Sequence, residues 1–257
     1  MKPPLNNQEQ LRKIKIITFH TDTVTWDCDP HPYGGYRVPH SNLIPYFLEA
    51  AKKNNPFAKT ILLTDLETKT SDYGFDKVVR RPISQTQLML ERMRLQYEAL
   101  ATNEGDDILF LDTDILILRN ISNVFNDDFD LGVTIRDNPI EAPEFTMPYN
   151  NGVVFVAGRA SQAISFLWRN LISNVENMNS QLHAWSGNQF AMRDFLGDRK
   201  AGDTFTIAGI KTKVFPCSTH NYTPREEEEE THDKWILHFK GNYKWLMPIY
   251  AKALLNY

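Results

Sequence analysis

Long apolar runs and cysteine are both scarce in this sequence of 257 residues. No apolar stretch approaches the roughly 20 residues that a membrane-spanning helix requires, and the first ten residues lack the apolar core of a secretion signal. The two cysteines, Cys28 and Cys217, are too few for a disulfide framework. We therefore expect no transmembrane segment, two reduced thiols and a cytoplasmic location, with peripheral attachment to the cytoplasmic membrane face left open.

Several catalytic signatures are absent as well. The sequence has no Gly-x-Gly-x-x-Gly, no phosphate loop ending in Gly-Lys-Ser/Thr, no Gly-x-Ser-x-Gly, no His-Glu-x-x-His and no Cys-x-x-Cys. Their absence disfavours dinucleotide oxidoreductases, P-loop enzymes, serine hydrolases and zinc proteins. The formal net charge of −4 provides no global basic field, so nucleic acid is not an expected partner. The chemistry left to consider is that of carboxylates and metal ions.

Strand and helix patterns alternate along the first half of the chain and become looser afterwards. Short apolar segments predict strands, and amphipathic segments predict helices. The predicted strands cover residues 13–19, 59–65, 77–80, 108–111, 115–118, 131–135, 150–156, 213–215 and 235–239. The predicted helices cover residues 41–53 (capped by Ser41), 85–102, 159–178, 188–196 and the tail to 257. This alternation is typical of an α/β protein with a mixed, mainly parallel sheet flanked by helices.

An acid–any–acid triplet, Asp112-Thr113-Asp114, directly follows the apolar segment 108–111. A continuous apolar run indicates a strand buried on both faces, and ligands bind at the carboxyl ends of such strands in open α/β sheets. Because Asp112 and Asp114 are two residues apart, their carboxylates project to one side of an extended chain and can share a hard cation. A polar strand end or an Asx turn remains the alternative interpretation.

Other polar residues also follow predicted strands. Thr18 and His20 lie at the end of the first strand, where a nucleotide would bind. Near the C-terminus, His238 can offer a neutral imidazole nitrogen to a metal, Gly241 permits close backbone approach to a phosphate, and Lys244 supplies a point charge. A structural strand-end histidine is the alternative for His238.

Four segments together resemble glycosyltransferase family 8, whose members are retaining enzymes of the GT-A fold. They are residues 110–125 (FLDTDILILRNISNVF), 149–152 (YNNG), 185–189 (WSGNQ) and 238–245 (HFKGNYKW). Two departures from the family pattern are a missing proline before Trp245 and an asparagine, Asn188, in place of an aspartate. Arg94, in the helix before the Asp pair, resembles the basic residue that the family has there.

The resemblance implies a GT-A (Rossmann-like) fold in a single domain over residues 1–257. Residues of about 13–135 would form its nucleotide-binding half and about 136–257 its sugar and acceptor half. A Mn²⁺ or Mg²⁺ ion would be bound by Asp112, Asp114 and His238. The residues expected at the nucleotide sugar are Thr18, His20, Arg94, Asp112, Thr113, Asn150, Asn151, Gly152, Gly241 and Lys244, and those expected in catalysis are Asp114, Asn188 and Gln189.

The implied reaction moves a sugar from a nucleoside-diphosphate sugar to an acceptor hydroxyl with retention. The acceptor is not assigned, and a glycan, a lipid-linked molecule and a protein all stay open, as does the oligomeric state. Loops 21–37, 136–148 and 218–231 are expected to carry acceptor specificity. Alternatives are a nucleotide-sugar hydrolase or a nucleotidyltransferase using the same metal site, and a catalytically silent sugar-nucleotide-binding module. A helix-surface cation is the alternative for Arg94.

Overall fold

The computed structural model describes residues 12–22, 38–137 and 147–255. Most of the proposed acceptor loops 21–37 and 136–148 lies outside these residues. The aromatic residues Trp26, Tyr33, Tyr36 and Phe145 of these two loops therefore lie outside the described part of the chain.

Eight strands form one twisted sheet in the order β3-β2-β1-β4-β7-β6-β9-β8. Their bounds are β1 Ile14–Phe19, β2 Lys59–Thr64, β3 Lys77–Arg80, β4 Asp107–Leu111, β6 Leu131–Ile135, β7 Tyr149–Val156, β8 Thr204–Ile207 and β9 Ile210–Pro216. Strands β3, β2, β1 and β4 are mutually parallel, as are β6 and β9. Strands β7 and β8 run against their neighbours, so the predicted mixed, mainly parallel sheet is confirmed.

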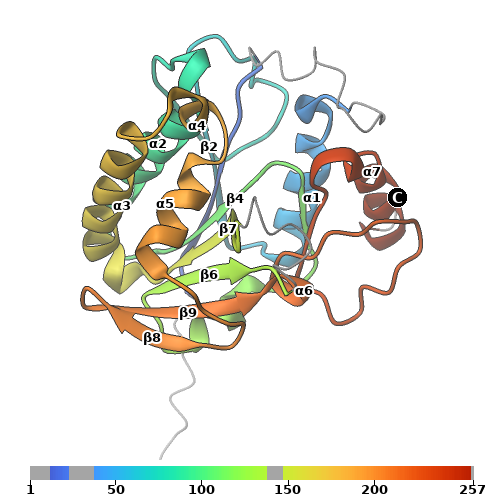
Figure 1. The fold of residues 1–257 in the computed structure, drawn as a ribbon. Coiled ribbons are helices and arrows are strands. Elements are labelled where there is room, and N and C mark those ends of the chain that lie inside the picture. The colour runs from blue at the N-terminus through green and yellow to red at the C-terminus, as the bar shows by residue number, and fades with distance from the viewer. Residues whose placement is uncertain (1–11, 23–37, 138–146, 256–257) are drawn as a thin grey trace, which may run out of the picture.

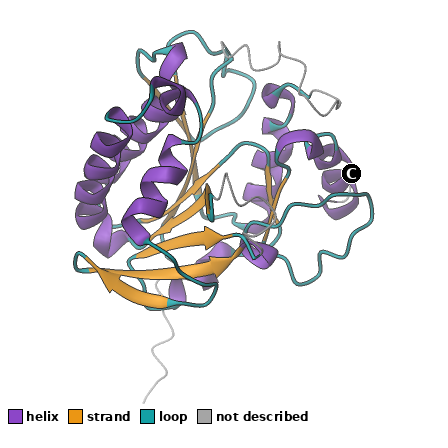
Figure 2. Cartoon of the chain, viewed as in Figure 1, coloured by secondary structure: helices purple, strands orange, loops and turns teal. Residues whose placement is uncertain are grey.

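Helices cover both faces of this sheet (Figures 1 and 2). One face carries α2 (Leu88–Ala101), α3 (Ser161–Glu176), α4 (Ser180–Ala184) and α5 (Gly187–Leu196), and the other carries α1 (Ile44–Asn54) and α7 (Leu246–Leu255). Side chains of β4 alternate between the two cores: Leu109 and Leu111 pack with α1 and α7, whereas Ile108 and Phe110 pack with α2 and α3. This two-sided burial explains why the strand before the Asp pair is a continuous apolar run.

A second, two-stranded sheet lies beside the carboxyl end of β4. It pairs β5 (Ile115–Ile117) with β10 (Ile236–His238) in antiparallel register, with His238 opposite Ile115. Residues 112–114 connect β4 of the large sheet directly to β5 of the small one. The fold thereby brings a C-terminal strand against the acidic triplet.

Several local predictions differ from the structure. Ser41 does not cap α1, because a 3₁₀ turn, η2 (His40–Asn42), precedes that helix and Leu43 is its N-cap residue. Residues 85–87 also form a 3₁₀ turn, η3, ahead of α2. Strand β8 and the short helices α4 and α6 (Cys217–His220) were not predicted. Over the part of the chain that the structure describes, no helix has both the length and the apolarity needed to cross a membrane.

Candidate active site

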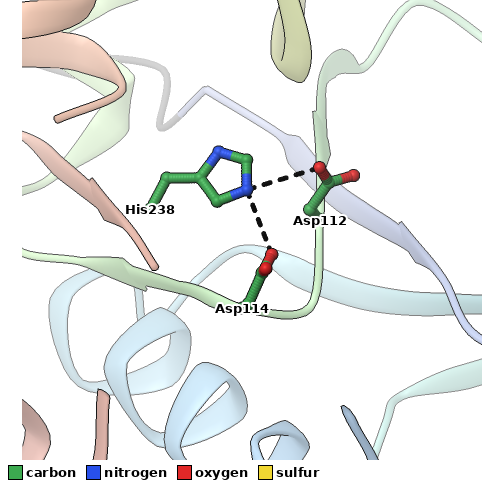
Figure 3. Close-up of side chains that lie close together, drawn as sticks. All are labelled: Asp112, Asp114 and His238. Carbon is green, nitrogen blue, oxygen red and sulfur yellow. Dashed lines mark ion pairs between the residues drawn. The ribbon is translucent and has the colours of Figure 1, made fainter. Parts of the chain in front are cut away.

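Asp112, Asp114 and His238 converge at the junction of the two sheets (Figure 3). The Nε2 atom of His238 lies 3.1 Å from Oδ1 of Asp114 and 3.4 Å from Oδ2 of Asp112. One ligand atom from each residue falls within 4.8 Å of the other two. His238 and Asp114 are buried, while Asp112 is partly exposed. Two carboxylates and one imidazole at this spacing form a donor set that suits a divalent cation such as Mn²⁺ or Mg²⁺.

Backbone hydrogen bonds hold the three residues in this arrangement. The amide of Asp112 donates to the carbonyl of Gly152 at 3.0 Å, and the amide of Phe239 donates to the carbonyl of Asp114 at 2.8 Å. The first bond continues the pairing of β4 with β7, and the second continues that of β5 with β10. The ligand geometry is therefore set by strand register rather than by flexible loops.

The charge states of the buried residues also suit a cation. Burial lowers the pKa of His238 from its ordinary value, which favours the neutral imidazole that can bind a metal. Burial alone would raise the pKa of Asp114, but a protonated His238 and Lys244 hold it well below its ordinary value; beside a neutral His238 the positive charge comes from Lys244. The Lys244 ammonium lies 3.3 Å from Oδ2 of Asp114. Asp114 is thus an ionised, buried carboxylate.

The basic residue beside the acidic pair is Arg92 and not Arg94. The buried Arg92 places Nη1 2.6 Å from Oδ1 of Asp112 and donates from Nη2 to the carbonyl of Asn151 at 3.0 Å. Arg94 points elsewhere on α2 and pairs with Glu91 at 2.8 Å and Glu176 at 2.7 Å, with 41% of its side chain exposed. Arg94 therefore matches the alternative interpretation of a helix-surface cation, and no role was predicted for Arg92.

Gly152 lies directly against the acidic cluster. A Cβ atom there would lie 2.3 Å from Cε1 of His238 and 2.7 Å from Oδ2 of Asp112. The side-chain oxygen of Asn150, predicted to hold a sugar, instead accepts hydrogen bonds from the Gly152 amide at 3.0 Å and from Asn221 at 3.1 Å. Gly152 therefore leaves space for the cluster, and Asn150 holds Gly152 and Asn221 in place beside it.

Three amide oxygens near this segment have no hydrogen-bond partner among the described residues. They are Oδ1 of Asn151, Oδ1 of Asn188 and Oε1 of Gln189. Asn151 also donates to the backbone carbonyl of Asn188 at 2.9 Å, which joins β7 to the start of α5. Buried acceptors without donors are costly, so these three oxygens are free to accept hydrogen bonds from a bound molecule.

A second group of unpartnered polar atoms lies at the carboxyl ends of β1 and β2. The hydroxyls of Thr18, Thr21 and Thr64 are buried without a hydrogen-bond partner among the described residues. His20 contacts Asp22, with 2.9 Å between Nε2 and Oδ1. These residues occupy the strand ends at which α/β sheets bind nucleotides.

The remaining predicted residues also lie around the cluster. The Thr113 hydroxyl is 3.2 Å from Nδ1 of His40, a residue that sequence reasoning missed because no recognisable motif surrounds it. Burial lowers the pKa of His40, while Asp114 opposes that shift. Gly241 has a φ of 55°, and a Cβ there would meet nothing within 4 Å. Glycine is therefore favoured at this position by the positive φ, and not by a lack of space for a side chain.

Comparison with known proteins shows which family this sequence matches. A family model described as nucleotide-diphospho-sugar transferase matches residues 49–245, more than half of the chain. No curated protein sequence matches.

Solved structures of similar fold include three glycosyltransferases. One is GlyE from Streptococcus pneumoniae TIGR4, with a TM-score of 0.57 and 12% identity over 95% of this chain and 62% of that one. Another is the galactosyltransferase LgtC, solved with donor and acceptor sugar analogs, with a TM-score of 0.53 and 11% identity over 93% of this chain and 96% of that one.

The third takes part in glycosylation of the major capsid of PBCV-1, with a TM-score of 0.54 and 14% identity over 93% of this chain and 98% of that one. At these identities the likeness is one of fold. This chain spans less than two thirds of the length of GlyE.

Proposed function

This chain belongs to the nucleotide-diphospho-sugar transferase family, and from that premise we propose a metal-dependent transfer of a sugar from a nucleoside diphosphate to an acceptor hydroxyl. The observation that carries the proposal is the convergence of Asp112, Asp114 and His238 within 4.8 Å at the edge of the sheet. Departure of a nucleoside diphosphate builds negative charge on its oxygens. The residues around the cluster are suited to oppose that charge.

Asp112, Asp114 and His238 would hold a Mn²⁺ or Mg²⁺ ion. When bound, such an ion supplies Lewis-acid stabilisation to the departing diphosphate. Lys244, already 3.3 Å from Asp114, would place a positive charge beside the same phosphates, and the open backbone at Gly241 would let them approach closely. Arg92 would keep Asp112 in place through its 2.6 Å ion pair.

The donor sugar would bind at the three unpartnered amide oxygens of Asn151, Asn188 and Gln189. Sugar hydroxyls are hydrogen-bond donors, and they would satisfy these acceptors while orienting the anomeric carbon. The unpartnered hydroxyls of Thr18, Thr21 and Thr64 would serve the nucleoside in the same way.

We propose that the transfer retains the anomeric configuration, as the resemblance to family 8 implies. Asn188 carries an amide where the family has a carboxylate. Because an amide cannot act as a nucleophile or a base, Asn188 would position the sugar only. Attack by the acceptor from the side of the leaving diphosphate then fits these residues better than a covalent intermediate.

The proposal does not specify the acceptor, for which a glycan, a lipid-linked molecule and a protein are the candidates. Trp185, with 58% of its surface exposed, lies three residues before Asn188 and is the described aromatic residue that we would test first for acceptor binding.

The test is product analysis with isotope-labelled sugar nucleotides and Mn²⁺. We expect labelled sugar on an acceptor and loss of turnover in Asp114→Ala, while Asp76→Ala, which removes a carboxylate bonded to Thr60 on β2, keeps it. Release of pyrophosphate would instead indicate a nucleotidyltransferase, and free sugar alone a hydrolase. Tight binding with no consumption of sugar nucleotide would point to a silent binding module, an outcome in keeping with the amide at Asn188.

A further inference from the structure

Asn221 is a fully buried amide directly behind His238. It follows α6 and precedes the bridge between Tyr222 and β10. Its Oδ1 atom lies 2.8 Å from Nδ1 of His238, on the side of the ring opposite the carboxylates. The sequence contains Asn221 in an Asn-Tyr-Thr sequon, but its burial leaves no room for a glycan in the folded protein.

Neighbouring hydrogen bonds fix which way the Asn221 amide faces. The backbone amide of Gly152 can only donate, so the Asn150 side-chain atom that lies 3.0 Å from it must be the oxygen. That oxygen is 3.1 Å from the Asn221 side chain, which must therefore present its NH₂ group. The same NH₂ group lies 2.7 Å from the Thr134 hydroxyl, which donates to the Asn150 carbonyl at 2.9 Å. The oxygen of Asn221 is left to face His238.

An amide oxygen accepts hydrogen bonds only, so Nδ1 of His238 must carry the proton of the neutral ring. The other ring nitrogen, Nε2, then directs a lone pair at the region between Asp112 and Asp114, 3.4 Å and 3.1 Å away. In this neutral tautomer, Nε2 and the two carboxylates present three electron-pair donors to one region, an arrangement that a cation would satisfy.

We infer that Asn221 is a positioning residue that holds His238 in its Nδ1-protonated tautomer and ring orientation, so that Nε2 is presented to a divalent metal ion. The inference rests on the proposed metal site and adds a residue that acts through His238. Outer hydrogen bonds of this kind typically change metal affinity 10- to 100-fold when they are removed.

The experiment measures Mn²⁺ binding to the full chain by isothermal titration calorimetry, without sugar nucleotide. Asn221→Leu keeps the volume but removes the acceptor, and we expect Mn²⁺ binding roughly 10- to 100-fold weaker. Asn221→Asp keeps an acceptor for Nδ1 but loses the NH₂ group toward Asn150 and Thr134, and we expect affinity within about threefold of the wild type, because a carboxylate can hold the same tautomer.

Asn55→Leu is the matched control. Asn55 is also a buried amide, but it bonds the backbone of Arg119 and Ile121 and not the cluster. We expect it to lower the melting temperature without changing Mn²⁺ affinity. Should Asn221→Leu fail to fold, Thr134→Val tests the same network by removing the shorter of the two contacts of the Asn221 NH₂ group, that of 2.7 Å, with Mn²⁺ binding expected to weaken several-fold.

The outcomes separate the inference from the proposed function. If the wild type binds no Mn²⁺, the metal site itself is wrong. If the wild type binds Mn²⁺ and Asn221→Leu or, failing that, Thr134→Val binds it equally well, the positioning role is wrong. Equal weakening in Asn221→Asp and Asn221→Leu would also overturn it, since both lose the NH₂ contacts and a purely structural role predicts equal damage.

Discussion

Arg92 and Arg94 lie two positions apart on α2 and offer a matched pair of substitutions. Arg92→Ala removes the ion pair to the partly exposed Asp112 and the hydrogen bond to the Asn151 carbonyl, so we expect sugar transfer to fall at least tenfold and unfolding free energy to fall by about 2 kcal/mol. Arg94→Ala removes exposed ion pairs, for which we expect normal transfer and a stability change below about 1 kcal/mol. Steady-state rates and urea unfolding check both. Equal effects of the two substitutions would contradict the assignment.

Gly152→Ala tests how closely β7 approaches the cluster. The added methyl group would overlap His238 and Asp112, so we expect Mn²⁺ affinity to fall at least tenfold, as calorimetry would measure. Gly132→Ala is the control, since its methyl group would crowd Phe215 and Phe155 in the core and should lower stability with Mn²⁺ affinity unchanged. Wild-type affinity in Gly152→Ala would show that the cluster is looser than described.

His220 gives a pH dependence that does not involve the metal ligands. Burial, with a smaller effect of Lys213, lowers the pKa of His220 from 6.5 to about 4. Between these two values the unfolded chain binds a proton that the folded chain does not, so stability is lost as pH falls, by up to about 3 kcal/mol. His220→Phe keeps an aromatic ring between Phe215 and Trp235. Urea unfolding at pH 7 and pH 4.5 should show a smaller loss in this variant than in the wild type, and an identical loss would refute the assignment.

At the residue scale, the sequence predicted which side chains lie together where the residue type rarely occurs at such a position for purely structural reasons. The structure brings Asp112, Asp114, His238 and Lys244 together, and each stood out because a charged or metal-binding side chain followed an apolar strand or a glycine. Arg92 and Asn221 were missed. Their roles depend on which way a helix faces and on a contact across 17 residues of sequence, neither of which the local pattern encodes.

At the scale of elements, the β8–β9 hairpin turns through Ala208 and Gly209, both with positive φ, 49° and 77°. A two-residue turn of this kind favours asparagine followed by glycine. We expect Ala208→Asn to raise the free energy of unfolding by about 0.5–1 kcal/mol and Gly209→Ala to lower it by about 1 kcal/mol. Urea unfolding measures both, and a destabilised Ala208→Asn would count against the turn geometry.

Buried strands were the most predictable elements, because burial on both faces leaves a continuous apolar run, as in β4. Strand β8 was missed although its residues alternate in polarity, since Ala208-Gly209 is a weak turn signal without asparagine. The start of α1 was misplaced because Ser41 has the chemistry of a cap but lies in a 3₁₀ turn. At this position the tertiary structure, and not the capping preference of serine, decides where the helix begins.

For the whole molecule, the expected α/β fold and the resemblance to GT-A glycosyltransferases of family 8 are confirmed by the sheet topology, the family match and the structural relatives. The site joins the large and small sheets, since Asp112 follows β4 and His238 ends β10. A ligand bound across this junction stabilises both sheets at once.

We therefore expect Mn²⁺ with a nucleoside diphosphate, at about 100 times its dissociation constant, to stabilise the protein by about 2.7 kcal/mol. For a chain of this length that is a rise in melting temperature of roughly 5 to 10 °C. Differential scanning calorimetry measures it, and Asp114→Ala should remove the dependence on Mn²⁺. A rise that survives this substitution would place the metal elsewhere.

The position of β10 so late in the chain has a consequence for synthesis. Asp114 is buried in the finished protein, yet Lys244, which compensates its charge, and His238, which lies beside it, follow it by well over a hundred residues. At translation speeds of about 5–20 residues per second, the carboxylate waits on the order of ten seconds for those partners. The junction between the two sheets must stay hydrated for that time, so the proposed catalytic centre is among the last parts of the nascent chain to close.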